Sequence, residues 1–259
     1  MLRKNKKGVY TLTRLAPFKN LVCAFSTRDF GNMKPFSKGQ VAEVEKNRRN
    51  FLKTLGSKNP NVVTAQQIHS NQVALVGKND SGKNVTGADG LITGEKGLFL
   101  MVFVADCLPI LAYDSKKEIV GIAHAGWQGT SEKIAENLVW AFQKLGSKPN
   151  DILVGIGPGI EFCHYEVRNE VVDKFTTAGF GKMVLRSLSG KTHIDLKQAV
   201  VDQLVGAGVP KANIDVSLKM CTYENPDLYS YRREKEKLSG EIAAVIGLLA
   251  GRQGSKDEK

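Results

Sequence analysis

Three short apolar runs in the middle of the chain give its clearest structural pattern. They cover residues 98–104, 109–113 and 119–123, and turn-forming or charged residues separate them. Each run is too short for an ordinary helix and is continuously apolar, which is typical of a strand buried on both faces. The sequence therefore predicts three buried strands in succession.

Helical and strand patterns alternate over the rest of the chain. We expect a helix over 42–55, a helix capped by Thr130 and ending near Leu145, and a helix opening at Asp195. A last amphipathic helix is predicted over 241–250, followed by a flexible polar tail from Gly251. Further strands are predicted at 22–25, 62–64, 152–156 and 214–218. No Pro/Ser-rich linker divides the chain, so we predict one α/β (α+β) domain over residues 1–259, with a core over about 22–250 and flexible tails.

Polar side chains follow several of the predicted strands. Asp106 and Cys107 come directly after the first central run, and His124 follows the third. His69 follows the strand near Val63. Since loops at strand ends are where a scaffold presents reactive groups, His69, Cys107 and His124 are candidates for one site.

Two histidines and one cysteine form a plausible ligand set for zinc. Imidazole and thiolate suit this ion, and three protein ligands leave a fourth coordination position open. An open position distinguishes catalytic from structural zinc sites. The residues alone leave the alternative that each side chain simply belongs to the core or the surface.

The net charge of +11, from 37 basic and 26 acidic residues, raises the question of an anionic partner. We find no nucleic-acid motif and no basic stripe with interleaved aromatic residues. A basic surface with a local anion site is favoured, without nucleic-acid or membrane binding. No apolar run approaches the roughly 20 residues that span a bilayer, and no apolar signal core follows the basic N-terminus. We therefore expect a cytoplasmic protein.

The four cysteines, Cys23, Cys107, Cys163 and Cys221, lie far apart without a CxxC spacing. The sequence thus suggests neither a disulfide framework nor a zinc ribbon.

Seven ordered segments resemble the signatures of one known family. They are QQIHS (66–70), ADGLIT (88–93), ADCLPIL (105–111), HAGWQG (124–129), GPGIEFCHYEV (157–167), THIDL (192–196) and CTYENPDLYSYRR (221–233). The chain resembles the laccase-domain or multicopper polyphenol oxidase family, also called purine nucleoside phosphorylases or peptidoglycan editing factors, from about Cys23 to about Leu249.

The resemblance implies a single domain with mixed β-sheets flanked by helices, sharing its architecture with the cytotoxic-necrotizing-factor-like cysteine hydrolases. It also implies a zinc site at His69, Cys107 and His124. The implied activity is phosphorolysis of adenosine, inosine, guanosine and methylthioadenosine, together with adenosine deamination. The implied partners are purine nucleosides and phosphate.

Candidate substrate-binding residues extend this site. Guanidinium groups bind phosphate in bidentate fashion, so the anion site is sought among four arginines. These are Arg28, Arg48, Arg232 and Arg233. Asp106 is a candidate for orienting a ligand or for acid–base chemistry, and Trp127 and Tyr165 for stacking on a purine. Two positions depart from the family pattern: Gln128 replaces the usual Arg, and Phe30-Gly31 replaces a Gly pair.

Three other functions compete with this hypothesis. A multicopper oxidase needs a blue-copper site and a further histidine-rich copper cluster, which four histidines (His69, His124, His164 and His193) cannot furnish. Polyphenol oxidation is therefore not favoured, although copper could bind at the zinc site. The main alternative is a hydrolase of peptidoglycan precursors that uses Cys107 as nucleophile and His124 as base. A binding module with a structural zinc is the third.

Overall fold

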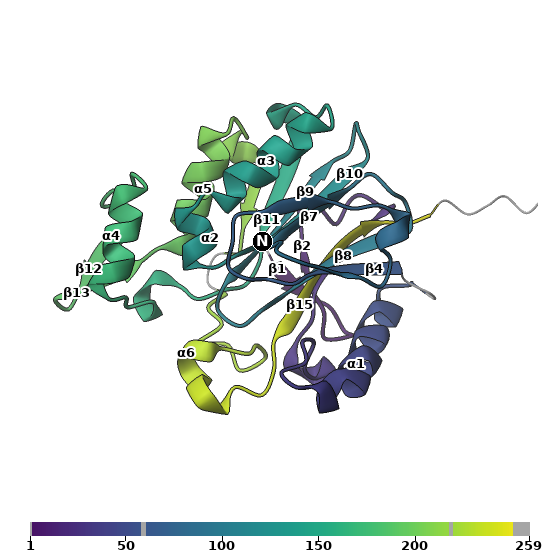
Figure 1. Cartoon of the computed structure of the whole chain (residues 1–259), viewed down its shortest axis with the longest axis horizontal. Coiled ribbons are helices and arrows are strands. Elements are labelled where there is room, and N and C mark those ends of the chain that lie inside the picture. The colour runs from purple at the N-terminus through teal and green to yellow at the C-terminus, as the bar shows by residue number, and fades with distance from the viewer. Residues whose placement is uncertain (1, 58–60, 218–219, 251–259) are drawn as a thin grey trace, which may run out of the picture.

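The computed structural model describes residues 2–57, 61–217 and 220–250. Its centre consists of two mixed β-sheets (Figure 1). In order across the larger sheet, the strands are β1 (Leu2–Lys4), β2 (Tyr10–Leu12), β3 (Leu21–Phe25), β15 (Ile242–Leu248), β8 (Leu98–Val104), β4 (Asn61–Ala65) and β6 (Asn84–Val85). The smaller sheet contains β14 (Ile214–Val216), β11 (Ile152–Ile156), β9 (Leu108–Asp114), β10 (Ile119–Ala125), β7 (Gly90–Thr93) and β5 (Val73–Leu75). The predicted α/β class with mixed sheets is confirmed, and the cysteine-hydrolase architecture stays a prediction.

Helices cover the outer faces of the two sheets. The helices are α1 (Val41–Thr54), α2 (Trp127–Ser131), α3 (Ile134–Lys144), α4 (Asn169–Thr177), α5 (Leu196–Gly206) and α6 (Tyr231–Glu234). Helix α1 packs on the larger sheet, whereas α3 and α5 pack on the smaller one (Figure 1). A small hairpin, β12 (Leu185–Leu188) with β13 (Lys191–Ile194), lies beside α4. The result is a layered arrangement with both sheets inside.

The continuously apolar central runs form strands that are buried on both faces. In β8, Leu100 and Val102 join the apolar cluster between the sheets, while Met101 and Phe103 join the cluster under α1. The same alternation holds in β9, where Leu111 faces the other sheet. Two-sided burial explains why these strands show no polar alternation in the sequence.

The C-terminal segment corrects one prediction. Residues 242–248 form strand β15 between β3 and β8, where a helix over 241–250 was expected. Ile246 faces the other sheet and Val245 faces α1, which is the two-residue period of a strand. Alanine and leucine favour helices, but burial on two faces overrides that propensity. The predicted tail from Gly251 lies outside the described residues.

The N-terminal segment corrects a second prediction. Residues before 22 were placed outside the core, yet β1 and β2 pair with one another and β2 pairs with β3. Val9 and Leu12 are buried in this region. The core therefore begins well before residue 22.

Thr130 is not the N-cap that the sequence predicted. It lies buried within α2, and α3 begins after Lys133, whose φ of 72° is left-handed. Asp195, in contrast, caps α5 as predicted by accepting a hydrogen bond from the Gln198 amide. No helix in the three described segments is long and apolar enough to cross a membrane.

Candidate active site

The ends of three strands bring His69, Cys107 and His124 together. Cys107 lies in the turn between β8 and β9, and His124 lies near the end of β10. β9 and β10 are antiparallel, and His124 is opposite Pro109 in their register. β4 runs parallel to β8, so the loop that carries His69 leaves the larger sheet near the Cys107 turn. The sheet topology thus gathers residues that are far apart in sequence.

The three side chains form a compact set of potential metal ligands. Their ligand atoms all lie within 4.8 Å of one another. The imidazole rings of His69 and His124 are 4.9 Å apart between centroids and meet edge to face. Two imidazoles and one thiolate are donors that zinc accepts, with one coordination position left open. The donor set therefore fits the implied metal.

Gly126 leaves the space that this cluster occupies. A Cβ atom at this position would lie 2.8 Å from Cδ2 of His69 and 3.1 Å from Sγ of Cys107. Both distances are shorter than ordinary van der Waals contact. Gly126, the first glycine in HAGWQG, is thus required for steric reasons next to the candidate ligands.

Asp89 orients the site, and sequence reasoning gave it no role. Its carboxylate lies 2.8 Å from Nδ1 of His124 and accepts hydrogen bonds from the backbone amides of His69 and Ser70. A carboxylate bonded to one imidazole nitrogen fixes the ring with its other nitrogen toward a metal. The only signal for Asp89 was its place in the segment ADGLIT, because its contacts span 20 and 35 positions in sequence.

The protonation equilibria of the cluster are strongly perturbed. Burial alone would raise the pKa of Cys107, but the charge of His124 and hydrogen bonds with both histidines lower this pKa to about 7. Burial opposes protonation of His124, but Cys107 and Asp89 raise its pKa to about 9. Burial also disfavours the charged form of Asp89, yet its bonds to His124 and Ser70 give it a lowered pKa. Near neutral pH, the cluster without metal therefore favours a thiolate beside an imidazolium.

Three of the seven described non-glycine residues with left-handed backbone lie at this site. Gln67, His69 and Asp106 have φ values of 59°, 63° and 93°, a region that non-glycine residues rarely adopt. The Gln67 side chain supports this geometry by pairing with the backbone N–H and C=O of Phe103 at 2.9 and 2.6 Å. Such strain persists only where surrounding contacts hold it, and it is frequent at functional sites.

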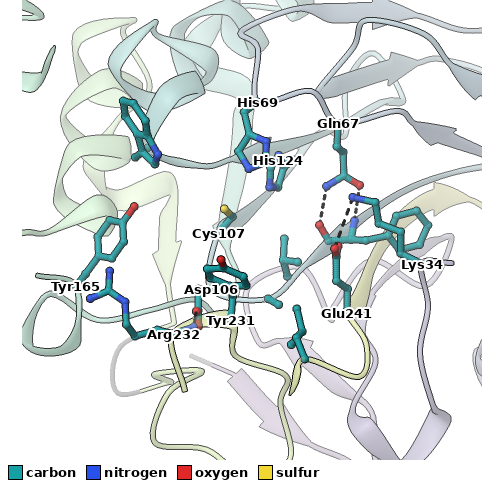
Figure 2. Close-up of a pocket in the computed structure, with 15 residues that line it drawn as sticks. Lys34, Gln67, His69, Asp106, Cys107, His124, Tyr165, Tyr231, Arg232 and Glu241 are labelled. Atoms are coloured by element: carbon teal, nitrogen blue, oxygen red, sulfur yellow. Dashed lines mark hydrogen bonds and ion pairs between the residues drawn. The ribbon is translucent and has the colours of Figure 1, made fainter. Parts of the chain in front are cut away.

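A cavity of about 440 Å³ opens beside the three candidate ligands. Figure 2 shows Tyr165 and Arg232 on one side of it and Gln67, Lys34 and Glu241 on the other. Trp127 and Tyr231 add aromatic surface to the lining. Small-molecule sites commonly have volumes of about 300–1,000 Å³ and combine apolar walls with a few polar groups.

Among the four candidate arginines, Arg232 is the one in the described cavity lining. Arg28 forms an ion pair with Glu234 and lies over the Tyr229 ring. Arg48 donates to the Met33 carbonyl, contacts Phe103, and lines a separate groove beside α1. Arg233 donates to the backbone carbonyls of Thr222, Tyr223, Asn225 and Leu228. These three arginines are thus engaged in structural contacts and are absent from the described cavity lining.

Asp106 and Tyr165 both reach the cavity, whereas Gln128 does not line it. The Asp106 carboxylate accepts the Thr222 hydroxyl at 2.5 Å and the Arg232 amide at 2.6 Å. Burial, followed by the nearby Cys107, raises the pKa of Tyr165, so its phenol stays neutral. Gln128 lies exposed on α2.

The remaining two histidines lie outside the described cavity lining. His164 belongs to a short 3-10 helix over Phe162–His164, and His193 lies in β13. Phe30, the second departure from the family pattern, packs edge to face on Phe51 of α1.

Comparison with known proteins gives relatives for nearly the whole chain. It is 35% identical over 251 residues to purine nucleoside phosphorylase YlmD of Geobacillus stearothermophilus, covering 89% of this chain and 91% of that protein. It is 36% identical over 189 residues to adenosine deaminase RL5 of an unknown prokaryotic organism, covering 69% and 72% of the two chains. The crystal structure of YlmD from Geobacillus stearothermophilus superposes with a TM-score of 0.88 and 31% identity, covering 96% of this chain and 99% of that one.

The family model described as multi-copper polyphenol oxidoreductase laccase matches residues 23–249. These limits agree with the extent of the resemblance seen in the sequence motifs. The match covers the whole smaller sheet, the larger sheet from β3 onward except its first two residues, and every candidate ligand described above. The chain therefore belongs to the multi-copper polyphenol oxidoreductase laccase family.

Proposed function

We propose that this protein is a zinc-dependent purine nucleoside phosphorylase, acting on adenosine, inosine, guanosine and methylthioadenosine, that also deaminates adenosine. The observation that carries the proposal is one cavity in which the cluster of His69, Cys107 and His124 meets an aromatic wall and Arg232. The activities for which YlmD and RL5 are named support it, since both relatives match more than two thirds of this chain.

His69, Cys107 and His124 would hold the zinc ion, with Asp89 orienting His124. When bound, zinc supplies Lewis-acid chemistry at the base of the cavity. The lowered pKa of Cys107 favours its ligand form, because a thiolate rather than a thiol binds metal.

The aromatic lining suits a purine ring. Tyr165 and Trp127 both line the cavity, and they come from different elements, the first from the 157–167 segment and the second from α2. An aromatic face in a water-poor pocket stabilises a stacked base by about 1–3 kcal/mol. The neutral Tyr165 phenol can also donate one hydrogen bond to a ring nitrogen.

Arg232 is the group that we assign to phosphate. Its guanidinium donates to the carbonyls of His164 and Glu166 at 3.1 and 2.9 Å, and it lies 5.3 Å from the Tyr165 ring centre. An arginine has five N–H donors, so donors remain for an anion. In phosphorolysis, a phosphate oxygen bonds to C1′ of the ribose while the C1′–N9 bond breaks and its electron pair passes to the purine.

Asp106 is better suited to positioning than to proton transfer. Both of its oxygens already accept short hydrogen bonds, one from Thr222 and one from the Arg232 backbone. This carboxylate therefore ties the start of α6 to the turn that carries Cys107. By holding Arg232 next to the candidate metal ligands, Asp106 would fix where phosphate meets the nucleoside.

The test is base release from inosine and adenosine by zinc-loaded protein, with and without phosphate. We expect phosphate-dependent formation of free base and ribose 1-phosphate, together with conversion of adenosine to inosine. Cys107→Ala should abolish both reactions, and Arg232→Gln should raise the KM for phosphate by about 10-fold or more. Zinc-loaded protein that releases no base under any condition would refute the phosphorylase assignment.

A cysteine hydrolase is the second candidate, and one observation favours it. Cys107, His124 and Asp89 form a chain of nucleophile, base and orienting carboxylate. In that reaction the Cys107 sulfur bonds to a carbonyl carbon while the bond from that carbon to the leaving group breaks, and the His124 imidazolium gives its proton to the leaving group. Water then hydrolyses the thioester, which releases the acid and regenerates the Cys107 thiolate. A cell-wall precursor would be the substrate.

Metal dependence separates the two candidates. A zinc enzyme loses activity after chelation and regains it with added zinc. A Cys–His hydrolase keeps its activity in chelator and loses it after thiol alkylation. Stimulation of peptidoglycan-precursor hydrolysis by metal removal would support the second candidate.

A further inference from the structure

A second cluster of metal-ligating side chains lies outside the cavity lining. Cys163 and His164 belong to the 3-10 helix at Phe162–His164, and Cys221 and Glu224 belong to the turn that follows β14. The ligand atoms of Cys163, His164 and Glu224 all lie within 4.8 Å of one another. Cys221 adds a fourth donor, since its Sγ lies 3.7 Å from Nδ1 of His164.

The distances around His164 suit tetrahedral coordination. Its Nδ1 lies 3.2 Å from Sγ of Cys163 and 3.7 Å from Oε1 of Glu224. A tetrahedral ion with metal–sulfur and metal–nitrogen bonds of about 2.3 and 2.0 Å separates sulfur from nitrogen by about 3.6 Å. Cys163, His164 and Glu224 are therefore already close to the spacing that a single ion requires, and Cys221 meets that spacing at His164.

Backbone contacts hold the two segments together independently of any ion. The Thr222 amide donates to the Gly159 carbonyl at 3.1 Å, and the Glu161 amide donates to Sγ of Cys221 at 3.3 Å. The imidazole of His164 stacks on the Tyr223 ring at 4.4 Å, with 19° between the planes. Such support reduces the ordering cost of forming a site from two loops.

We propose that Cys163, His164, Cys221 and Glu224 bind a second ion of the zinc class. Two thiolates, one imidazole and one carboxylate satisfy four coordination positions, which is the closed arrangement of a structural zinc site. This ion is separate from the one assigned to His69, Cys107 and His124, and its presence does not depend on nucleoside chemistry.

The second ion would stabilise one wall of the cavity. Tyr165 directly follows His164, and the His164 carbonyl accepts a hydrogen bond from the Arg232 guanidinium. Thr222 and Asp106 connect the other ligand-bearing segment to the cavity. An ion that joins the two segments would therefore fix Tyr165, Arg232 and Asp106 relative to one another.

The test is metal content of the full chain, measured by mass spectrometry after stripping, reloading with Zn²⁺ under reducing conditions and desalting. We expect about two Zn²⁺ per chain in the wild type and about one in Cys107→Ala, which leaves the second cluster intact. His164→Ala combined with Glu224→Gln should also bind about one. All three substitutions together should remove both ions. Cys23→Ser is the matched control, because Cys23 lies in β3 apart from both clusters and should leave the zinc content unchanged.

Cobalt loading identifies the ligands without reference to activity. Co²⁺ in Cys107→Ala should give sulfur-to-cobalt absorption in the near ultraviolet, which Cys163→Ser should weaken and His164→Ala should shift. Circular dichroism and thermal melting show that each variant is folded. A folded Cys107→Ala protein that binds no metal would overturn the proposal.

Discussion

The two cysteine–histidine clusters differ in how the fold builds them. In the first, His69, Cys107 and His124 come from the ends of strands in both sheets and sit at the base of a cavity. In the second, Cys163 and His164 are neighbours in one short helix, and Cys221 and Glu224 come from one turn. The first has three donors beside open space, while the second has four donors beyond the cavity wall.

Their surroundings differ as much as their ligands do. Asp89 is fully buried and bonded to His124, whereas Glu224 has 61% of its side chain exposed. The first cluster also carries left-handed backbone at His69 and Asp106. A strained, oriented, incomplete ligand set fits chemistry, and a relaxed, complete set fits structure.

The largest expected effect concerns the two cysteines. Cys107→Ser should reduce phosphorolysis by more than about 100-fold, because it removes a ligand at the base of the cavity. Cys163→Ser should reduce it by less than about 10-fold, because it acts through the position of Tyr165 and Arg232. Steady-state rates of base release measure both. Equal losses of phosphorolysis rate in the two variants would contradict the proposed catalytic role of the first cluster and structural role of the second.

Asp89→Asn should produce the next largest effect. It removes the carboxylate that orients His124, so zinc affinity or activity at the first cluster should fall by about 10–100-fold. Competition with a zinc-binding dye measures the affinity. Asp114→Asn is the control, since Asp114 is equally buried but caps a turn at the other end of β9. An Asp89→Asn protein with wild-type zinc affinity would show that the carboxylate is only structural.

The sequence predicted the three candidate metal ligands but not the carboxylate that orients one of them. His69, Cys107 and His124 were predicted because each follows an apolar run, and the structure brings all three together. Asp89 was missed because it precedes its strand and acts through contacts made only in the folded chain. Arg28, Arg48 and Arg233 could not be separated from Arg232 by residue type, since their partners lie on other segments.

The fold, like the site, was predictable from the sequence only where a local pattern allowed a single interpretation. The central strands were predicted with ends within two residues, because continuous apolar runs have few alternatives. Strand β15 was mistaken for a helix because its residues satisfy both patterns, and only its place between β3 and β8 decides the matter. The second cluster gave no CxxC signal, since its two cysteines lie on separate segments that meet in space.

Thiol chemistry in the metal-free protein gives a third contrast. The pKa of Cys107 is lowered to about 7, whereas burial, Cys221 and Glu224 raise the pKa of Cys163 above its usual value. Cys107 is therefore largely thiolate at pH 7.5, and Cys163 is largely thiol. Because the thiolate is the reacting form, Cys107 should be alkylated roughly 10-fold faster at this pH.

Mass spectrometry of iodoacetamide-treated peptides over a pH series measures both rates. The Cys107 rate should rise with a midpoint near pH 7, and the Cys163 rate should still be rising above pH 9. His124→Ala is the informative variant, since losing its charge should move the Cys107 midpoint upward. A common midpoint for both cysteines in the wild type would contradict the thiolate–imidazolium pair.

Gly126→Ala should give the smallest effect and tests the packing of the first cluster alone. The backbone there, with φ of −78° and ψ of 175°, suits alanine, so any effect must come from the added methyl group. That methyl would meet Cδ2 of His69 at 2.8 Å and Sγ of Cys107 at 3.1 Å. Displacing these two side chains should weaken zinc binding at the first cluster by about 5–10-fold, at an overpacking cost of about 1 kcal/mol.

Gly77→Ala is the control, because a Cβ there meets nothing within 4 Å. Zinc titration of Gly126→Ala should show one weakened site and one unchanged site, whereas weakening of both would mean that the two clusters are not independent.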